Sequence, residues 1–297
     1  MYDIIIVGCG PAGLSASIYA RRNNKKTLIL ESNNYGGQII NTLDIENYPV
    51  IEHISGFDFA TNLYNQAKKL GAEIKFEKVN GIKNLDDCKE VITSKGTYIA
   101  KSVILATGSN NRHLGLDRED ELIGKGISYC ATCDGSFYKG KDVAVVGSGN
   151  VAVDDAIYLS GIANKVYIII RKDKFSAEEK SVIDLKDKKN IEIIKNSNVT
   201  KLNGDKVLES VTINNDKEIK VSGLFIAIGR VPNNEEFKDL IKVDDYGYIK
   251  SDESCHTNID GIYVAGDNRT KELRQLVTAT SDGAIAATEA IKYINKR

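Results

Sequence analysis

Residues 2–13 read YDIIIVGCGPAG, an apolar run followed by three glycines in a GxGxxG pattern. The apolar run is typical of a buried strand, and in dinucleotide-binding folds these glycines stand where the strand turns into a helix. Gly8 permits the tight turn, Gly10 lets a pyrophosphate approach the backbone, and Gly13 lets the helix pack against the strand. Because the helix N-terminus then faces the phosphates, this stretch predicts a Rossmann-like unit at the start of the chain.

An acidic residue follows at the distance that such a site requires. The apolar segment 27–30 is expected to be a second strand, and it ends at Glu31, eighteen residues after Gly13. A carboxylate at this position accepts hydrogen bonds from both hydroxyls of a ribose. A glycine turn can also serve packing alone, but the strand, the helix and the acidic residue together favour nucleotide binding.

The same pattern recurs in the middle of the chain. Residues 141–152 read KDVAVVGSGNVA, and each copy is followed by an apolar strand ending in glycine, VILATG at 103–108 and LFIAIG at 224–229. The repeat predicts two related nucleotide-binding units and hence an α/β fold with two Rossmann-like domains. A further strand is expected at 262–267, and a helix at about 275–294 closes the chain.

The second glycine turn carries Gly147 and Gly149, with Ala152 in place of the third glycine, which is a tolerated variant. The strand that follows ends at Arg171 and Lys172. Basic side chains at this position suit the 2′-phosphate of NADPH rather than the free hydroxyl of NADH. The alternative is a solvated basic loop end, but the position within a second fingerprint favours NADPH.

The composition is that of an ordinary globular protein. The chain has 297 residues, of which 42% are apolar and 27% are charged, and its formal net charge is −1. The length predicts two domains, and the charge gives no reason to expect nucleic acid as a partner. The apolar runs are too short to span a bilayer, and the N-terminus lacks the pattern of a secretory signal. We therefore expect a cytoplasmic protein without a membrane segment.

Residues 130–134 read CATCD and lie just before the second fingerprint. Two cysteines with this spacing meet across one turn and form a short, reducible disulfide. A position near a helix start or a polar turn would lower the pKa of one thiol and raise its thiolate fraction. Asp134 directly follows Cys133 and is placed to move protons during disulfide exchange. We therefore expect Cys130, Cys133 and Asp134 to be the catalytic residues.

Other roles for the cysteines fit less well. A zinc site would need two more ligands beside Cys130 and Cys133, and the chain has no second CxxC. The three histidines are isolated in sequence: His53, His113 and His256. A purely structural disulfide does not suit a cytosolic protein. The other cysteines are expected to be ordinary thiols: Cys9, Cys88 and Cys255.

Two nucleotide fingerprints with a CxxC immediately before the second resemble the low-molecular-weight thioredoxin reductases over essentially the whole chain. The CATCD string at 130–134 is the strongest match. Glutathione-reductase-like enzymes instead place a longer-spaced cysteine pair just after the first fingerprint. GGQ at 36–38 and ENYP at 46–49 resemble family segments that line the flavin. Asp267 resembles the residue on the ribityl chain, and RQ at 274–275 resembles the segment that reaches the flavin ring.

The resemblance implies a domain organisation. An FAD-binding domain would consist of residues 1–112 and 236–297, and an NADPH-binding domain carrying the redox CxxC, residues 113–235, would be inserted between them. It also implies a homodimer. The nicotinamide and the disulfide compete for the flavin face in this family, so one domain rotates against the other between half-reactions. Polar linkers at about 109–115 and 230–235 suit such a hinge.

The resemblance also implies roles for the site residues. Cys133 would lie against the flavin, Cys130 would exchange with thioredoxin, and Asp134 matches the family's acid. Electrons would pass from NADPH through FAD and the disulfide to thioredoxin. The residues expected to bind the cofactors are Gly8, Gly10, Pro11, Ala12, Gly13, Glu31, Gly37, Gln38, Asn47, Ala106, Thr107, Gly108, Gly147, Gly149, Asn150, Val151, Ala152, Arg171, Lys172, Gly266, Asp267, Arg274, Gln275 and Leu276.

The segment that would bind the 2′-phosphate departs from the family pattern, which usually reads His-Arg-Arg with another Arg four residues on. Here Ile170 replaces the His, Lys172 the second Arg, and Ser176 the later Arg. Some relatives have degraded nicotinamide motifs and take electrons from reduced ferredoxin, but the intact turn at 147–149 argues against that donor. The other open alternatives are a different disulfide-containing partner, such as a glutaredoxin-like protein, and a nucleotide-binding scaffold without turnover, which would leave CATCD without a role.

Overall fold

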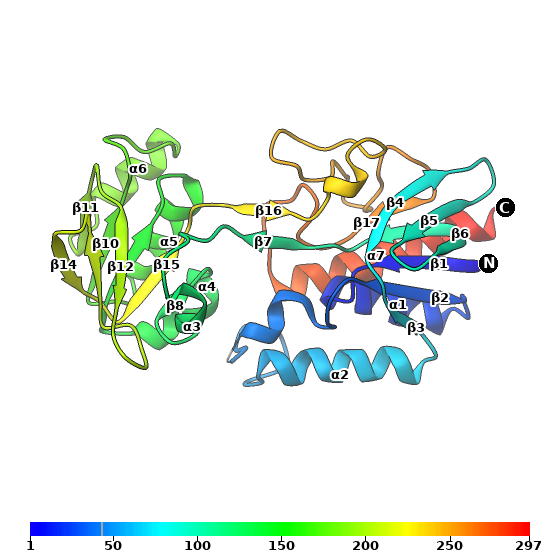
Figure 1. Cartoon of the computed structure of the whole chain (residues 1–297), viewed down its shortest axis with the longest axis horizontal. Coiled ribbons are helices and arrows are strands. Elements are labelled where there is room, and N and C mark those ends of the chain that lie inside the picture. Colours follow the sequence, from blue (N-terminus) through cyan, green and yellow to red (C-terminus); the bar gives the residue numbers. More distant parts are fainter. Residues whose placement is uncertain (43) are drawn as a thin grey trace. The chain divides into compact units, whose positions relative to one another are not determined.

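The computed structural model describes residues 1–42 and 44–297. The chain divides into two compact units (Figure 1). The first unit comprises Met1–Asn110 and Val231–Arg297, and the second unit, Asn111–Arg230, is inserted between these two segments. Within the described residues, no helix combines the length and the apolar character that a membrane span requires.

The first unit is built around a seven-stranded sheet. Its strands are β1 (Tyr2–Val7), β2 (Thr27–Glu31), β3 (Glu73–Phe76), β4 (Val79–Asn84), β5 (Lys89–Thr93), β6 (Thr97–Leu105) and β17 (Ile262–Val264). Its helices are α1 (Pro11–Arg22), η1 (Gly37–Asn41), α2 (Gly56–Lys69), η3 (Glu235–Phe237) and α7 (Leu276–Asn295). Both chain termini belong to this unit (Figure 1).

Strand β6 joins the parallel part and the antiparallel part of this sheet. Its C-terminal half pairs in parallel with β1 and β17, and β1 continues the parallel sheet to β2 and β3. Its N-terminal half pairs with β5, which pairs with β4, and both of these pairings are antiparallel. Parallel strands bring their carboxyl ends to one edge, so the loops after β1, β2, β6 and β17 share that edge of the sheet.

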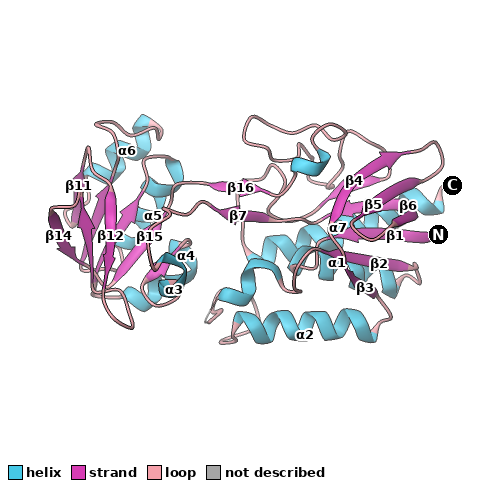
Figure 2. Ribbon diagram, in the orientation of Figure 1, coloured by secondary structure: helices cyan, strands magenta, loops and turns pink. Residues whose placement is uncertain are grey.

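The parallel part of this sheet is buried on both faces, as parallel sheets usually are. In β1, Ile4 and Ile6 pack into one core cluster together with α1 and α7, whereas Ile5 and Val7 pack into another cluster on the opposite face. Helices α1 and α7 approach each other closely. A Cβ added to Gly283 would fall only 2.1 Å from the Ala12 carbonyl oxygen, so this approach requires glycine at position 283. Figure 2 shows these helices beside the sheet.

The second unit repeats the pattern on a five-stranded parallel sheet, ordered β11-β10-β9-β15-β8. Its strands are β8 (Ile127–Ser128), β9 (Asp142–Val146), β10 (Lys165–Ile169), β11 (Ile191–Ile194), β12 (Val199–Asn203), β13 (Ser210–Ile213), β14 (Lys217–Lys220) and β15 (Gly223–Ile226). Its helices are α3 (Glu119–Leu122), α4 (Ala131–Asp134), η2 (Gly135–Tyr138), α5 (Asn150–Ser160) and α6 (Glu179–Lys186). Strands β12, β13 and β14 form a separate antiparallel sheet.

The two connections between the units are extended rather than irregular. Strand β7 (Ser109–Asn111) pairs with β16 (Arg230–Pro232). Hydrogen bonds on either side of the pair join Asn233 N–H to the Gly108 carbonyl and Arg112 N–H to the Gly229 carbonyl. The predicted α/β fold with two Rossmann-like units, the second inserted into the first, is confirmed. The polar segments expected as linkers form this two-stranded ribbon.

Candidate functional site

The first glycine turn lies between β1 and α1, and the surrounding backbone explains two of its glycines. Gly8 has φ of +110°, and a Cβ there would fall 2.2 Å from the Ala106 carbonyl oxygen. A Cβ on Gly13 would fall 2.0 Å from the Gly8 carbonyl oxygen. Gly10 differs, because a Cβ there would meet no protein atom closer than Gly37 Cα at 3.8 Å. Packing does not require Gly10 to be glycine, so the space beside it suits a phosphate group approaching the start of α1.

Glu31 lies at this turn. The backbone N–H of Cys9 donates a hydrogen bond of 2.8 Å to Glu31 Oε2, and Asn33 N–H donates one of 3.0 Å to Oε1. The carboxylate at the end of β2 is therefore held beside the glycine turn. This is the position that a ribose-binding carboxylate occupies in a dinucleotide fold.

Other predicted FAD-binding residues gather at the same edge of the sheet. A Cβ added to Gly266 would fall 3.0 Å from Ala12 Cβ, so the loop after β17 lies against the start of α1. Asn47 Nδ2 donates a 3.2 Å hydrogen bond to Gln275 Oε1, so two segments far apart in sequence meet. Leu276 begins α7, while Ala106, Thr107 and Gly108 directly follow β6. The roles of these residues toward a flavin stay predictions.

The second glycine turn, between β9 and α5, has the same design. Gly147 has φ of +148°, and a Cβ there would fall 2.2 Å from the Ala227 carbonyl oxygen. A Cβ on Gly149 would meet nothing closer than Ser176 Oγ at 3.9 Å. Ser176 N–H donates to the Ser148 carbonyl at 2.8 Å, so this loop residue lies against the turn. Here too the second glycine leaves open space at the start of a helix.

The side chains that would recognise the adenosine end of a nicotinamide cofactor differ in exposure. Arg171 and Lys172 are exposed just after β10. Ile170, which stands where the family has a histidine, is fully buried in the core of the second unit. Val151, at the start of α5, is 64% exposed although it is apolar. The substitution at Ile170 thus changes a core position, whereas both basic side chains remain accessible to a phosphate.

The two cysteines of CATCD form a disulfide. Cys130 and Cys133 have Cα atoms 5.3 Å apart, and both residues are partly buried. Asp134 closes the short helix α4 that carries Cys133. Burial raises the pKa of the Asp134 carboxyl, and a 2.6 Å hydrogen bond from Ser128 opposes this rise. An exchangeable disulfide and a carboxyl that holds its proton more firmly than usual therefore lie on one short segment.

Comparison with known proteins places this arrangement in a family. Residues 2–283 match the model of the pyridine nucleotide-disulphide oxidoreductases. The chain belongs to this family. It is 43% identical to a 34.2 kDa protein in the rubredoxin operon of Clostridium pasteurianum, an alignment that covers 98% of this chain and 97% of that protein. It is 41% identical to a thioredoxin reductase of Listeria monocytogenes, with 100% and 95% coverage.

A solved structure agrees with this assignment. The thioredoxin reductase from Streptococcus pyogenes superposes with a TM-score of 0.96 at 39% identity, covering 100% of this chain and 99% of that one. The resemblance to low-molecular-weight thioredoxin reductases is confirmed. This pyridine nucleotide-disulphide oxidoreductase carries the Cys130–Cys133 disulfide in its inserted unit.

The other three cysteines of this oxidoreductase are free thiols. Cys9 and Cys255 are fully buried, and burial raises the pKa of each thiol to about 12. Such thiols remain protonated and unreactive near neutral pH. Cys88 is partly exposed. The expectation that these residues are ordinary thiols agrees with their surroundings.

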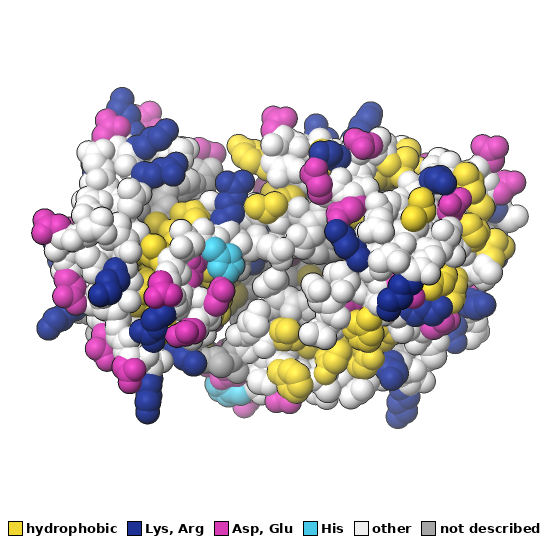
Figure 3. All heavy atoms as spheres, viewed as in Figure 1, with side chains coloured by type: hydrophobic (Ala, Val, Ile, Leu, Met, Phe, Trp, Pro, Cys, Tyr) yellow, Lys and Arg dark blue, Asp and Glu magenta, His cyan; other side chains and the backbone are white. Residues whose placement is uncertain are grey.

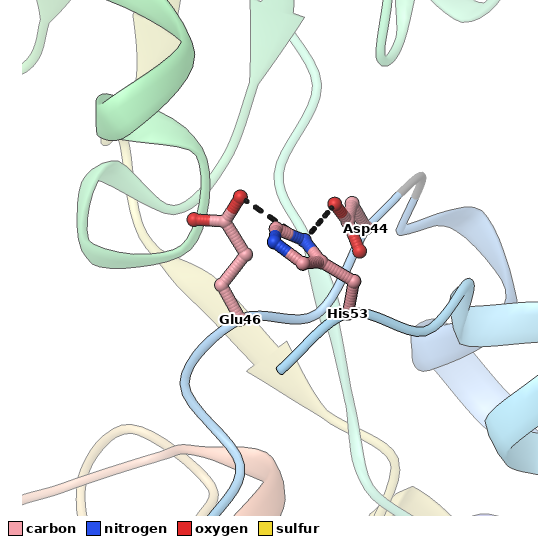
Figure 4. A group of neighbouring side chains, drawn as sticks. All are labelled: Asp44, Glu46 and His53. Carbon is pink, nitrogen blue, oxygen red and sulfur yellow. Dashed lines mark hydrogen bonds and ion pairs between the residues drawn. The ribbon is translucent and has the colours of Figure 1, made fainter. Parts of the chain in front are cut away.

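The three histidines, which are isolated in sequence, have carboxylate neighbours in the structure. Figure 4 shows His53 between Asp44 and Glu46, with its Nδ1 2.8 Å from Asp44 Oδ2 and 3.6 Å from Glu46 Oε1. The hydrogen bond with Asp44 raises the pKa of His53. All three side chains lie at the surface, where exposed ion pairs of this kind are common. His113 and His256 likewise lie beside carboxylates.

Sequence reasoning missed a buried polar cluster around the predicted cofactor residue Thr107. Asn268 Nδ2 donates to Thr107 Oγ1 at 2.9 Å, and Asn234 Nδ2 donates to the Asn268 carbonyl at 2.8 Å. Asn234 and Asn268 are 2% and 0% exposed, respectively. The Asn233-Asn234 pair is typical of a turn, so the sequence contained no signal that Asn234 would be buried.

Proposed function

We propose that this protein is a thioredoxin-disulfide reductase that passes electrons from NADPH through FAD and the Cys130–Cys133 disulfide to thioredoxin. The observation that carries the proposal is the disulfide itself, which shares one short segment with the partly buried Asp134 carboxyl. Relatives named thioredoxin reductase match almost the entire chain, which supports thioredoxin as the acceptor. A scaffold without turnover would leave this segment without a role.

The thiol chemistry is assigned to three residues. In the reduced protein, the Cys130 thiolate attacks one sulfur of the thioredoxin disulfide, so that bond breaks and a mixed disulfide forms. The displaced thiolate takes a proton from Asp134. Cys133 then gives up its thiol proton and attacks Cys130 Sγ as a thiolate, so the bond between Cys130 and thioredoxin breaks and the Cys130–Cys133 disulfide is restored. The second sulfur of thioredoxin leaves as a thiolate and takes up the proton that Cys133 lost. Two electrons pass from the protein dithiol to the partner disulfide.

The first unit fits FAD. Glu31 at the glycine turn suits an adenosine ribose, which FMN lacks, and the open space at Gly10 suits a pyrophosphate. FAD, when bound, supplies the step between a two-electron hydride and thiol chemistry. Heat release and chromatography of the bound flavin test this assignment. FAD is expected, and recovery of FMN alone would contradict it.

The second unit fits NADPH. The open space at Gly149 suits a pyrophosphate, and the exposed Arg171 and Lys172 suit a 2′-phosphate. Ferredoxin is the second candidate donor, because Ser176 and Ile170 depart from the family's phosphate-binding segment.

The protein is also proposed to act in the cytoplasm, as a homodimer. Charges of both signs are interspersed on the face that Figure 3 displays, without the basic stripe that a nucleic-acid-binding surface presents.

Anaerobic titration distinguishes the donors. The purified flavoprotein is mixed in parallel with NADPH, NADH and reduced ferredoxin while flavin absorbance is followed, and thioredoxin reduction is then assayed with each donor. Bleaching by NADPH together with thioredoxin turnover is the expected result. If neither nucleotide reduces the flavin at millimolar concentration while ferredoxin does, the nicotinamide assignment is wrong. If the flavin is reduced but thioredoxin is not, another disulfide protein is the acceptor.

A further inference from the structure

Ser128 lies at the centre of the redox segment although it belongs to a different element. It is the last residue of β8, which pairs in parallel with β15 through Ile127 and Ser128, opposite Leu224 and Phe225. Ser128 is 3% exposed. The sheet therefore fixes the backbone of this serine two residues before Cys130.

Two hydrogen bonds join the Ser128 hydroxyl to the redox segment. Cys130 N–H donates to Ser128 Oγ at 3.0 Å, and Ser128 Oγ donates to Asp134 Oδ2 at 2.6 Å. The hydroxyl also lies 3.3 Å from the Cys130 carbonyl, a longer and weaker contact. A single buried hydroxyl thus connects the cysteine at one end of α4 with the carboxyl at its other end.

We propose that Ser128 is a positioning residue that holds Cys130 and Asp134 in place and keeps the Asp134 proton available for transfer. This inference rests on the acid role proposed above for Asp134. The short hydrogen bond stabilises the carboxylate that remains after the proton has left. Without it, burial alone would act on Asp134, and the carboxyl would give up its proton less readily.

Two other titratable groups, on the neighbouring elements η2 and α5, could contribute to the pH profile. Burial and the nearby Asp134 carboxylate raise the pKa of Tyr138, on η2, to about 12, so its hydroxyl stays protonated across the range of an enzyme assay. Asp155 lies on α5, which packs beside α4. Burial and the adjacent Asp154 raise the pKa of Asp155 to about 7, so its ionisation falls within the assay range. The variant Asp155→Asn removes that ionisation.

The test uses a single turnover that is independent of the electron donor. The flavoprotein is reduced with stoichiometric dithionite and mixed with oxidised thioredoxin between pH 5.5 and 9. Because this chain has no tryptophan, the tryptophan fluorescence of thioredoxin reports its own reduction. The variants are Ser128→Ala, Ser128→Thr and Asp134→Asn. Asp155→Asn is measured beside them, because it removes the Asp155 ionisation from the pH profile. Ser197→Ala is the matched control, because Ser197 is a buried serine of the same unit whose hydroxyl bonds the Lys195 carbonyl.

Ser128→Ala is expected to lower the transfer rate about tenfold at pH 7, as loss of efficient proton transfer should. The limb where the rate falls with rising pH should move to higher pH, since the neutral carboxyl now persists longer. The thioredoxin concentration giving half-maximal rate should change less than about twofold. Ser128→Thr keeps a hydroxyl and should restore both rate and profile, and Ser197→Ala should match wild type.

The outcomes separate the two proposals. If Asp134→Asn removes the limb but Ser128→Ala leaves rate and profile unchanged, the role of Ser128 is wrong and that of Asp134 stands. If Asp134→Asn keeps the wild-type profile, the acid role of Asp134 fails, and the role of Ser128 fails with it. Equal loss in Ser128→Ala and Ser128→Thr, with an unmoved limb, would show a packing role only.

Discussion

Asp282 binds Arg269 through both carboxylate oxygens, at 2.8 and 2.9 Å, although each side chain is only 5% exposed. Lys271 Nζ lies 2.8 Å from the same carboxylate, and Gly266 N–H donates to it at 2.9 Å. Asp282 is on α7, whereas its partners belong to the loop after β17. One buried carboxylate thus fixes the loop that carries Asp267, a proposed FAD ligand.

The first prediction concerns the stability of this network. Asp282→Ala should destabilise the first unit by about 3–5 kcal/mol, because it leaves two buried cations without their counter-ion. The measurement is thermal unfolding followed by flavin release. Asp239→Ala removes an exposed carboxylate of the same unit and should change stability by less than about 0.5 kcal/mol. Equal effects of both variants would contradict the network's importance.

The second prediction concerns acid. Burial acts to raise the pKa of Asp282, but hydrogen bonds from Arg269 and Lys271 outweigh it and hold the pKa below its usual value. The stabilisation is therefore complete above the unfolded pKa of about 4 and is lost as the pH falls through the lower folded value. Asp282→Asn should lose stability less steeply than wild type below about pH 4. Parallel pH curves for the two proteins would refute this.

The third prediction separates cofactor binding from packing at the first turn. Gly10→Ala should fold, since no protein atom lies within 3.8 Å of the new Cβ, but it should retain flavin at least about tenfold more weakly. Gly13→Ala should fold poorly, because its Cβ would fall 2.0 Å from the Gly8 carbonyl oxygen. Circular dichroism measures folding, and the ratio of flavin to protein absorbance measures binding. Wild-type flavin content in Gly10→Ala would show that no pyrophosphate lies against Gly10.

The fourth prediction concerns the electron path. Cys130→Ser and Cys133→Ser should each reduce thioredoxin turnover to below about one hundredth, because a serine hydroxyl cannot form the disulfide, while flavin stays bound. Cys88→Ser replaces a partly exposed free thiol and should keep nearly full turnover. The assay is steady-state thioredoxin reduction. Substantial turnover by either redox variant would place the path elsewhere.

The fifth prediction concerns the choice of nucleotide. Arg171→Ala should raise KM for NADPH about ten- to a hundredfold and barely change KM for NADH, since a charge-assisted bond to phosphate is lost. Ser176→Arg should improve NADPH use selectively by adding a positive charge beside the second glycine turn. Comparison of kcat/KM for both nucleotides tests this. Equal losses with NADPH and NADH in Arg171→Ala would mean that Arg171 does not bind the 2′-phosphate.

Much of the site is predictable from sequence because its parts are local. A strand, a glycine turn and a helix occupy about a dozen consecutive residues, so the spacing of Gly8, Gly10 and Gly13 alone indicates their arrangement. The same holds for Cys130 and Cys133, whose spacing allows the disulfide that the structure contains. The repeat of the glycine pattern likewise predicted two units without reference to any contact between distant residues.

Contacts between distant segments could be identified only from the tertiary structure. In the sequence, Asn234 is typical of an exposed turn and Asp282 of the exposed face of a helix. Both side chains are nevertheless almost fully buried. Whether a polar side chain faces water or a partner depends on burial, and burial is decided by how α7 and the loop after β17 pack together. The sequence by itself determined the glycine turns and the cysteine pair of the disulfide, because neighbouring residues build them. The tertiary structure alone decided which buried polar groups support them, because a desolvated charge or amide is stable only where folding supplies its partner.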